Sequence, residues 1–468
     1  MKLNINKLLY TSLAFSVLAT GCLADLDLKP TDSVDQATSI KTVSDLNTGV
    51  VGVYAGFAAA NTQYATSLLT DEATMPLENN TGRGVIVYRW QYDAGGGETA
   101  PAWANYYDVI DRGNRLLKVI DGIPATDAEL ATKNRLKGEL LGLRAFAHLE
   151  LLRYYAVDYE PTSPGVPVMT VSQLSKPGRE TVGKVLEQIN KDLTDAKALI
   201  PTSFTPNTRI TLNAITAIQA RAALLQKNYD AAIGFATEII NKAALASRTQ
   251  FPNIWLDTDN TEVIWKLKRD NGQERLGTNY RDLTGRIIYA PAFKLMDLFD
   301  KTNDIRFASY FKALNTSPTN PRWTVQKFVG GQAALVNLAD AKLFRVAEMY
   351  LIRAEAYAKQ GAAGLLSGNA DLTTLRTARI AGYVPVAYAT PDALLTAVIE
   401  ERFKELAFEA HRYVDLRRNN LPINRGPNDV AQAQGAVNLT TDRREYYIPI
   451  PNAEIMANEV IKQHPKWQ

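Results

Sequence analysis

An uninterrupted helical pattern near the C-terminal end places the strongest constraint on the fold. Residues 391–418 contain no glycine, and their only proline stands at the first position. Apolar side chains recur there at spacings of three and four, which puts them on one face of a helix. The residues of this face are Leu395, Ile399, Phe403, Leu406, Ala410 and Tyr413. The pattern predicts one continuous helix over 391–418 and a mainly α-helical chain.

A second stripe on this helix carries charge. Glu401, Glu405, Glu409 and Arg412 fall together at about 100° per residue. Carboxylates four residues apart repel by a few tenths of a kcal/mol per pair, so cations from neighbouring helices are expected to face them. The candidate cations are Arg144, Arg221, Arg345, Arg353 and Arg376. A structural ion network is favoured, and a pair of catalytic carboxyls stays as the alternative.

The same stretch resembles a known family. Its motifs are Glu401-Arg402, Glu405-Leu406, Glu409, His411-Arg412 and Asp415-Leu416-Arg417-Arg418. They resemble the C-terminal signature of the SusD/RagB family, surface lipoproteins that pass nutrients to an outer-membrane transporter. Similar blocks occur in order along the chain, including Asp304-Ile305-Arg306 and the Tyr446–Ile455 segment. Two features depart from the family pattern. Ala410 stands where glycine is usual, and Gln463-His464-Pro465-Lys466-Trp467 stands where the family usually has Gln-Asn-Pro-Gly-Tyr.

Composition excludes several classes of site. The 468 residues carry a formal charge of +3 without a basic stripe, so a nucleic-acid partner is not expected. A single cysteine rules out an internal disulfide, and three histidines without a second thiol argue against structural zinc. We expect no cofactor or metal, although calcium, which needs only oxygen ligands, stays open.

The N-terminus predicts a lipid anchor. Lys2 and Lys7 precede a short apolar run that is too short to span a bilayer and fits a signal-peptide core. The run ends on Gly21-Cys22, which resembles a lipoprotein cleavage site. We expect a signal peptide over 1–21, acylation at Cys22 and a tether over 22–42. An ordinary secretory signal with an incidental cysteine is the alternative.

Helical pairs are expected to build residues 43–468 into a single SusD-like α-helical domain. Leu212–Lys227 and Asp230–Ala243 carry small alanines on facing sides and resemble a tetratricopeptide (TPR) unit. Other predicted helices are Val43–Ala60, Trp103–Ile120, Asp127–Asp158, Val182–Leu199, Leu343–Ala358 and Asp371–Ile380. The fold class is therefore a TPR-like helical-pair scaffold with an irregular, loop-rich lobe. Short strands are expected in that lobe, at Val263–Leu267 and around Val85–Trp90.

Two loop-rich regions, about 74–101 and 248–340, are the candidate binding regions. A sugar ring is held by a flat aromatic against its apolar face and by polar groups at its rim. The candidate glycan-binding residues are Asp71, Arg83, Trp90, Tyr92, Tyr280 and Trp323. The resemblance implies non-catalytic capture of an oligosaccharide on the outer face of the outer membrane, and a SusC-like TonB-dependent transporter as partner.

Two rival functions stay open. RagB-like relatives handle peptides, and a peptide site would use charged and backbone-pairing groups instead of aromatic platforms. A helical glycoside hydrolase would use paired carboxylates. No Gly-x-Ser-x-Gly elbow occurs, and the only cysteine is the expected lipid site. We therefore expect a binding protein and not an enzyme.

Overall fold

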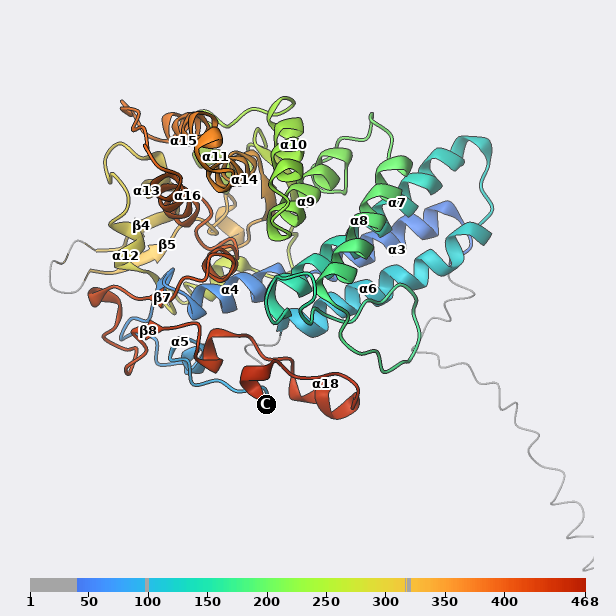
Figure 1. Ribbon diagram of the computed structural model, residues 1–468, viewed down its shortest axis with the longest axis horizontal. Coiled ribbons are helices and arrows are strands. Elements are labelled where there is room, and N and C mark those ends of the chain that lie inside the picture. Colours follow the sequence, from blue (N-terminus) through green and yellow to red (C-terminus); the bar gives the residue numbers. More distant parts are fainter. Residues whose placement is uncertain (1–39, 97–100, 316, 318–320) are drawn as a thin grey trace, which may run out of the picture.

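Helices supply most of the regular structure in the computed structural model, which describes residues 40–96, 101–315, 317 and 321–468 (Figure 1). The longer helices are α3 (Val43–Ala55), α4 (Ala59–Leu69), α6 (Pro101–Val119), α7 (Asp127–Tyr155), α8 (Val182–Leu199), α9 (Leu212–Leu225), α10 (Tyr229–Ile240), α14 (Val346–Lys359), α15 (Leu365–Arg379) and α16 (Pro391–Glu405). The predicted mainly α-helical fold is confirmed. Within the described ranges, no helix is both long and apolar enough to cross a membrane.

Short elements fill the rest of the chain. The short helices are α5 (Val85–Tyr88), α11 (Phe251–Trp255), α12 (Phe293–Met296), α13 (Ile305–Tyr310), α17 (Arg412–Arg418) and α18 (Asn452–Ala457). The strands are β1 (Ala73–Thr74), β2 (Val263–Leu267), β3 (Ala290–Pro291), β4 (Phe311–Ala313), β5 (Trp323–Val325), β6 (Ala341–Arg345), β7 (Ile423–Asn424) and β8 (Asn438–Leu439). They form four antiparallel two-stranded ladders, β1–β3, β2–β6, β4–β5 and β7–β8.

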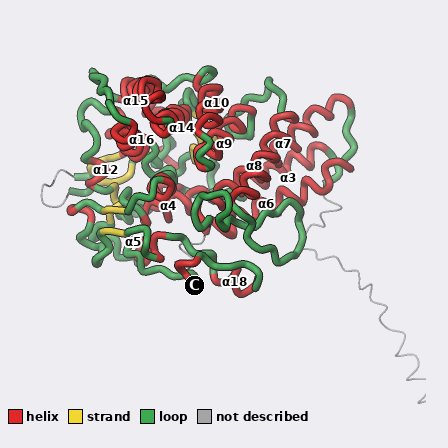
Figure 2. Tube along the Cα trace, viewed as in Figure 1, coloured by secondary structure: helices red, strands yellow, loops and turns green. Residues whose placement is uncertain are grey.

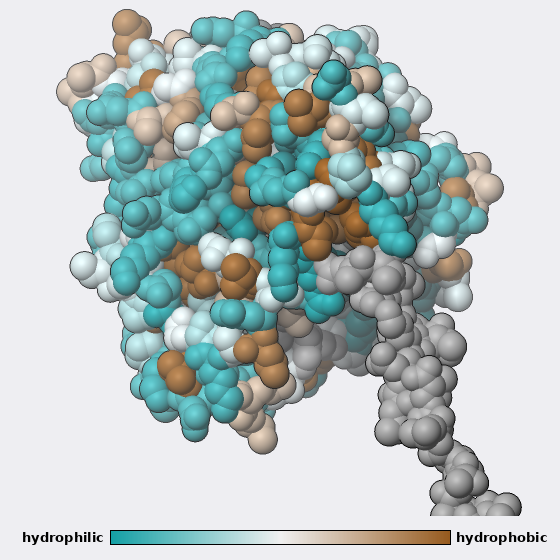
Figure 3. Space-filling view, turned by 90° about the vertical axis from the view of Figure 1, so that its right-hand side faces the viewer, coloured by the Kyte–Doolittle hydropathy of each residue, from teal (hydrophilic) through white to brown (hydrophobic). Residues whose placement is uncertain are grey.

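The helices form two neighbouring groups. At one end α6 and α8 pack on the long helix α7, and α3 lies against the same helix (Figure 1). In the second group α9 pairs with α10, and α14 contacts α10, α15 and α16. Strands and loops gather at the end opposite α3 (Figure 2). Seen from the α3 end, hydrophobic residues gather near the middle of the molecule and hydrophilic ones surround them (Figure 3).

Small residues allow the TPR-like pair to pack closely. Ala217 and Ala220 on α9, and Ala232 and Ala236 on α10, are fully buried. Because these side chains end at Cβ, the two helix backbones approach without leaving voids. The expected close-packed helical pair is therefore confirmed, and α14 covers the side of α10 next to it.

Capping residues explain why several predicted boundaries agree with the structure. Thr126 caps α7 in a capping box with Glu129, which satisfies backbone N–H groups that the first turn leaves open. Thr181 caps α8 through the N–H of Lys184, and Pro201 follows the end of that helix. The structure thus places α8 over the predicted residues.

The helix predicted over 391–418 is wrong in its middle. It ends at Glu405, and α17 begins at Arg412 after a turn in which Phe408 and Ala410 have φ values of 64° and 63°. Such left-handed backbone favours glycine, which gives a physical reason for glycine being usual in the family at the position of Ala410. No glycine or proline marks the break, because tertiary contacts impose it: the Phe408 N–H donates to Glu72 Oε1 at 2.8 Å.

Three other predicted elements also differ. Leu343 belongs to strand β6 and not to the following helix, because β6 pairs with β2. The segment around Val85–Trp90 forms the single helical turn α5 and not strands. The helix predicted over Val43–Ala60 ends at Ala55, next to Gly56, and a second helix follows.

The predicted signal peptide and acylated cysteine lie outside the described residues. Residues 1–39 are not described, so the structure leaves Cys22 and most of the predicted tether untested. The described chain begins at Ile40, directly before the capping residue Thr42 of α3.

Candidate functional site

The charged stripe of α16 lies inside the protein. Glu401 and Glu405 are fully buried, and Glu409 in the following turn is nearly so. Glu401 accepts hydrogen bonds from Arg306 at 2.6 Å and Arg376 at 2.7 Å. Glu409 pairs with Arg345 at 2.7 Å. Each carboxylate therefore has guanidinium partners close enough to offset the loss of water.

Glu405 stands at the centre of this network. Its carboxylate contacts Arg345 at 2.7 Å, Arg306 at 3.0 Å and Arg379 at 3.1 Å. Arg345, the last residue of β6, also pairs at 2.8 Å with Glu262, which directly precedes β2. We call this set the buried ion network; it comprises Glu262, Asp304, Arg306, Lys327, Arg345, Arg376, Arg379, Glu401, Glu405 and Glu409.

These carboxyls are poorly suited to acid–base chemistry. Burial alone would raise the pKa of Glu401, but Arg306, Lys404 and Arg376 lower it to about 2. The same balance, with Arg379, Arg345 and Arg306 prevailing over burial, holds the pKa of Glu405 below its usual range. A general acid needs a pKa near the working pH. The geometry therefore supports the structural network that the sequence predicted.

The supply of cations was predicted only in part. Arg345 and Arg376 face the stripe as expected, while Arg144 pairs with Asp192, Arg221 with Glu348 and Arg353 with Asp371. The assignment of Arg144, Arg221 and Arg353 to the stripe was wrong, because each pairs with a carboxylate on another neighbouring helix. Arg306 and Arg379 also face the stripe but were not predicted to do so. The Asp304-Ile305-Arg306 motif could have indicated Arg306.

Asp71, a predicted ligand residue, is an internal ion-pair partner. It is 1% exposed and pairs with Arg412 at 2.8 Å and Lys294 at 2.7 Å. Burial acts to raise its pKa, but these two cations lower it to about 2. Arg412 therefore leaves the glutamate stripe and joins α17 to the start of the first loop region. Both oxygens of Asp71 are engaged by these cations.

Three of the predicted aromatic residues are also buried. Trp90 is 4% exposed and donates its indole N–H to the carbonyl of Leu69 at 2.9 Å. Tyr92 is 2% exposed, and its hydroxyl donates to a backbone carbonyl. Tyr280 is 1% exposed, and its hydroxyl lies 3.0 Å from that of Ser67. Their rings are packed against protein here, so they support the loops and present no open face to a ligand.

Arg83 and Trp323 are the predicted residues with accessible surface. Arg83 is exposed; its guanidinium donates to Asn279 Oδ1 and lies 4.9 Å from the centre of the Tyr64 ring. Trp323 is half-buried at the start of β5, and its ring meets Phe307 edge-on at 5.7 Å. Arg83 ends the 76–83 loop, and Trp323 directly follows Arg322, which pairs with Glu78 of the same loop.

A set of charged contacts joins the two loop regions beside these residues. Glu78 accepts two hydrogen bonds from Arg322, at 3.0 and 2.8 Å, and a third from the Ile287 N–H at 3.3 Å. The hydrogen bond from Arg322 lowers the pKa of Glu78. Arg286 donates to Asn80 Oδ1 at 2.9 Å. We call this surface, formed by residues 76–83, 277–287 and 322–323, the loop face.

The loop face combines polar groups with exposed apolar side chains. Leu77 is 81% exposed and Leu283 is 65% exposed. Guanidinium groups have planar, forked donors that suit hydroxyl, carboxylate and carbonyl acceptors. The face therefore offers hydrogen-bond donors around apolar patches, which is a chemistry for binding polar ligands. Sequence reasoning missed Glu78, Arg286 and Arg322, although Arg322 directly precedes the predicted Trp323.

Comparisons with known proteins agree with this architecture. A model described as the SusD family matches residues 297–467, and one described as starch-binding associating with outer membrane matches residues 26–224. The comparison with curated proteins found no match.

Solved structures share the fold. A SusD superfamily protein from Bacteroides thetaiotaomicron is 23% identical, covers 91% of this chain and 100% of its own, and has a TM-score of 0.81. A SusD-like carbohydrate binding protein from Bacteroides vulgatus is 21% identical, with coverages of 90% and 98% and a TM-score of 0.76. A laminarin binding SusD-like protein is 19% identical, with coverages of 91% and 100% and a TM-score of 0.68.

The family matches and the fold lead to one assignment. The two family models leave only residues 1–25, 225–296 and 468 unmatched. The predicted signature around Glu401–Arg418 falls within the first of these matches. This chain belongs to the SusD family.

Proposed function

We propose that this protein captures an oligosaccharide at its loop face and delivers it to a SusC-like TonB-dependent outer-membrane transporter. The observation that carries the proposal is the arrangement of Arg83, Arg286 and Arg322 beside the half-buried Trp323 on one surface. In this proposal the arginine guanidinium groups bind ring hydroxyls, and the exposed part of the Trp323 side chain packs against an apolar sugar face. The similarity in fold to a laminarin binding SusD-like protein supports a glycan ligand.

In this proposal the protein binds its ligand without cleaving it. Glu401 and Glu405, the candidate paired carboxyls of the α16 stripe, are held in the buried ion network by Arg306, Arg345 and Arg379. A glycosidase requires one protonated and one ionised carboxyl on either side of a substrate. Fully buried, charge-paired carboxylates do not meet that requirement.

Anchoring at the cell surface is part of the proposal. Acyl chains on Cys22 would hold the protein at the outer membrane, with residues 22–42 as the tether. Mass spectrometry of the protein from membranes tests this: we expect a lipid-modified Cys22, and we expect Cys22→Ser protein to leave the membrane fraction. Recovery of an unmodified, soluble wild-type protein would contradict the anchor.

Electrophoresis through gels that contain a polysaccharide tests capture. We expect laminarin, starch or another glycan of a panel to retard the wild-type protein. Trp323→Ala should weaken the retardation, and Phe307→Leu, which changes the buried partner of that ring, serves as the packing control. The same mixtures should show no new reducing ends. Release of reducing ends by the purified protein would establish an enzyme instead.

A peptide ligand is the second candidate, and a specific observation favours it. The structure buries Trp90, Tyr92 and Tyr280, whereas arginines lie at the surface of the loop face. A surface rich in guanidinium groups suits carboxylates and backbone carbonyls of acidic peptides. Parallel titrations with neutral glycans and with acidic peptides decide between the candidates: binding of peptides alone would replace the glycan proposal.

Delivery to a transporter has its own test. We expect a SusC-like protein to co-purify with the tagged full-length protein from solubilised outer membranes. Failure to recover any transporter under conditions that preserve the membrane anchor would contradict the delivery step. It would not affect the proposed ligand capture, which the gel experiment tests separately.

A further inference from the structure

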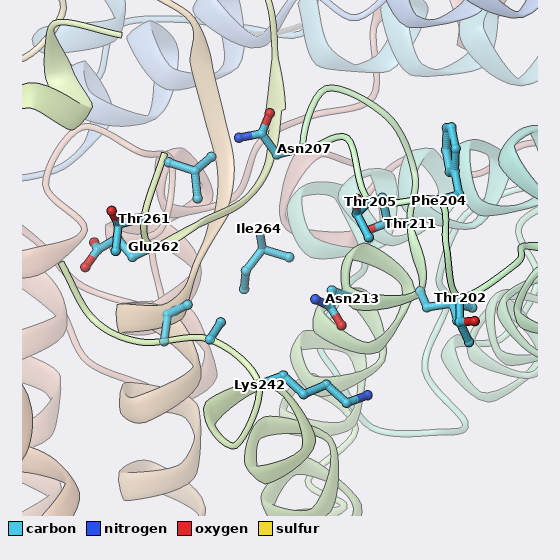
Figure 4. A pocket seen from close by; sticks show the side chains of 14 residues that line it. Thr202, Phe204, Thr205, Asn207, Thr211, Asn213, Lys242, Thr261, Glu262 and Ile264 are labelled. Atoms are coloured by element: carbon cyan, nitrogen blue, oxygen red, sulfur yellow. The ribbon is translucent and has the colours of Figure 1, made fainter. Parts of the chain in front are cut away.

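A separate cleft of about 390 Å³ lies between the two helical groups. The loop after α8, the first turn of α9, the end of α10 and strand β2 enclose it (Figure 4). Thr261 lies at one end and Thr202 at the other, with Asn207, Asn213 and Ile264 in the middle. None of the residues of the loop face lines it. Ligand pockets are typically about 300–1,000 Å³, so the volume suits a small ligand.

The polar groups of the cleft have unused hydrogen-bonding capacity. The side-chain amides of Asn207 and Asn213 and the hydroxyls of Thr202 and Thr205 have no protein partner among the described residues. Each amide can donate two hydrogen bonds and accept two, and each hydroxyl can do both. The wall that these four residues form therefore suits a ligand with both hydrogen-bond donors and acceptors, such as the hydroxyl groups of a sugar.

The charges in the cleft are already neutralised by the protein. Lys242 pairs with Glu238 at 3.0 Å, and Glu262 pairs with Arg345 at 2.8 Å and Arg379 at 2.7 Å. The Glu262 carboxylate is fully buried with its guanidinium partners, whereas the Lys242 side chain is 53% exposed and its pair with Glu238 can exchange with water. The rest of the lining is uncharged, and the apolar side chain of Ile264 provides a floor for the carbon skeleton of a ligand.

Backbone contacts hold the walls of the cleft in place. The Lys266 N–H donates to the carbonyl of Asn207 at 2.8 Å, which fastens the loop after α8 to β2. The Val346 N–H donates to the carbonyl of Glu262 at 2.9 Å, which fastens β2 to the start of α14. A site with fixed walls loses less entropy when it binds a ligand.

A second, more open cleft lies next to the first. Lys242 and Ala243 line both, and the second, of about 600 Å³, extends to Tyr350 on α14 and Thr377 on α15. The lining therefore extends across the ends of three helices. A ligand longer than one ring would follow this path, with the half-buried Tyr350 at its far part.

We infer that this cleft is a second binding site for neutral, polyhydroxylated ligands of the oligosaccharide class. It is separate from the loop face and does not depend on the loop face binding a sugar. Asn207 and Asn213 are the specificity-determining residues, because they present amide groups on both sides of the floor formed by Ile264.

Saturation-transfer NMR on the full-length protein tests the inference. The probes are maltotriose and laminaritriose as neutral sugars, and trigalacturonate as the charged one. The variants are Asn207→Ala with Asn213→Ala, the loop-face pair Arg83→Ala with Trp323→Ala, and all four together. Neither asparagine side chain has a protein partner, and alanine favours the helical position of Asn213, so the fold should be kept. The matched control is Asn190→Ala, an exposed position on α8.

We expect a neutral trisaccharide to give a signal that persists in the loop-face pair and falls at least about fivefold when both cleft asparagines are also replaced. The control should keep the wild-type signal, and thermal unfolding midpoints should agree. The inference is overturned if no neutral sugar gives a signal, if trigalacturonate alone binds, or if the signal of the loop-face pair is unchanged when Asn207 and Asn213 are also replaced. Failure of the loop-face proposal would look different: Arg83→Ala with Trp323→Ala would then change nothing, while the asparagine variants removed the signal.

Discussion

The buried ion network and the loop face both contain arginine–glutamate ion pairs, the first in the protein interior and the second in contact with water. Arg345 meets Glu405 at 2.7 Å in the interior, and Arg322 meets Glu78 at 2.8 Å at the surface. Side-chain exposure is 1% and 0% for the first pair, and 37% and 30% for the second. Nearly equal distances therefore accompany very different hydration, and hydration decides what each pair can do.

In the interior, removing one partner leaves a charge with neither water nor counter-ion. At the surface, water replaces a lost partner at little cost, so exposed pairs contribute about 0–1 kcal/mol. A ligand can likewise replace a partner at the surface, but not in the network. We therefore expect the buried ion network to stabilise the fold and the loop face to bind ligands.

The largest expected effect is on Arg345, which serves three carboxylates. Arg345→Met keeps an unbranched apolar stem but deprives Glu262, Glu405 and Glu409 of a shared cation. We expect the free energy of unfolding to fall by about 3–5 kcal/mol, as for other broken buried pairs. Urea unfolding followed by circular dichroism measures it.

Arg322→Met is the matched control at the surface. Its loss should change the free energy of unfolding by less than about 1 kcal/mol. Similar losses for the two variants would show that burial does not separate the two regions, and the division of roles between them would be wrong.

Acid should weaken the network over a defined range of pH. The arginines around Glu401 prevail over burial and lower its pKa from 4.5 to about 2, and Asp71 is lowered from 3.8 to about 2. Between the pKa values of the folded and the unfolded state, the unfolded chain therefore binds more protons than the folded one. The contribution of Glu401 and Asp71 to the free energy of unfolding is complete above about pH 5 and is lost as the pH falls toward 2. For Glu401 it is on the order of 3 kcal/mol.

Denaturant unfolding at a series of pH values checks this expectation, and proton uptake on unfolding provides a second readout. A free energy of unfolding that stays constant from about pH 5 to about pH 3 would be inconsistent with buried, charge-stabilised carboxylates.

The turn that separates α16 from α17 should give a smaller effect of opposite sign. Ala410 has a φ of 63°, a region that costs an L-residue about 1–2 kcal/mol, while glycine loses more entropy on folding. We expect Ala410→Gly to raise the free energy of unfolding by about 0.5–1 kcal/mol. Ala407→Gly, at a buried position without positive φ, should lower it. Equal destabilisation by both would argue against the left-handed turn.

Helix periodicity made much of the scaffold predictable. Apolar spacing predicted α7 and α8 closely, and the alanines of α9 and α10 predicted their close packing. The glutamate stripe likewise indicated cations on neighbouring helices. These signals are local, so a single sequence contains them.

The break in the last helix and the composition of the loop face were not predictable in the same way. The turn at Phe408 depends on Glu72, which is distant in sequence. The sequence did not indicate which aromatic side chains of the loops are buried. Trp90 and Tyr280 were predicted to contact the ligand but lie inside the protein, where they form hydrogen bonds with Leu69 and Ser67. Burial of a loop side chain follows from tertiary packing, which residue type alone does not fix.

Binding of glycans to an array by wild-type protein and by the Arg83→Ala, Arg322→Ala double variant tests the central claim most directly. We expect the wild-type protein to bind at least one glycan and the variant to bind that glycan at least about tenfold more weakly, since a hydrogen bond to a charged group contributes about 1.5–3 kcal/mol. The free energy of unfolding of the two proteins should differ little. No glycan bound by the wild-type protein, or equal binding by both, would contradict ligand capture at the loop face.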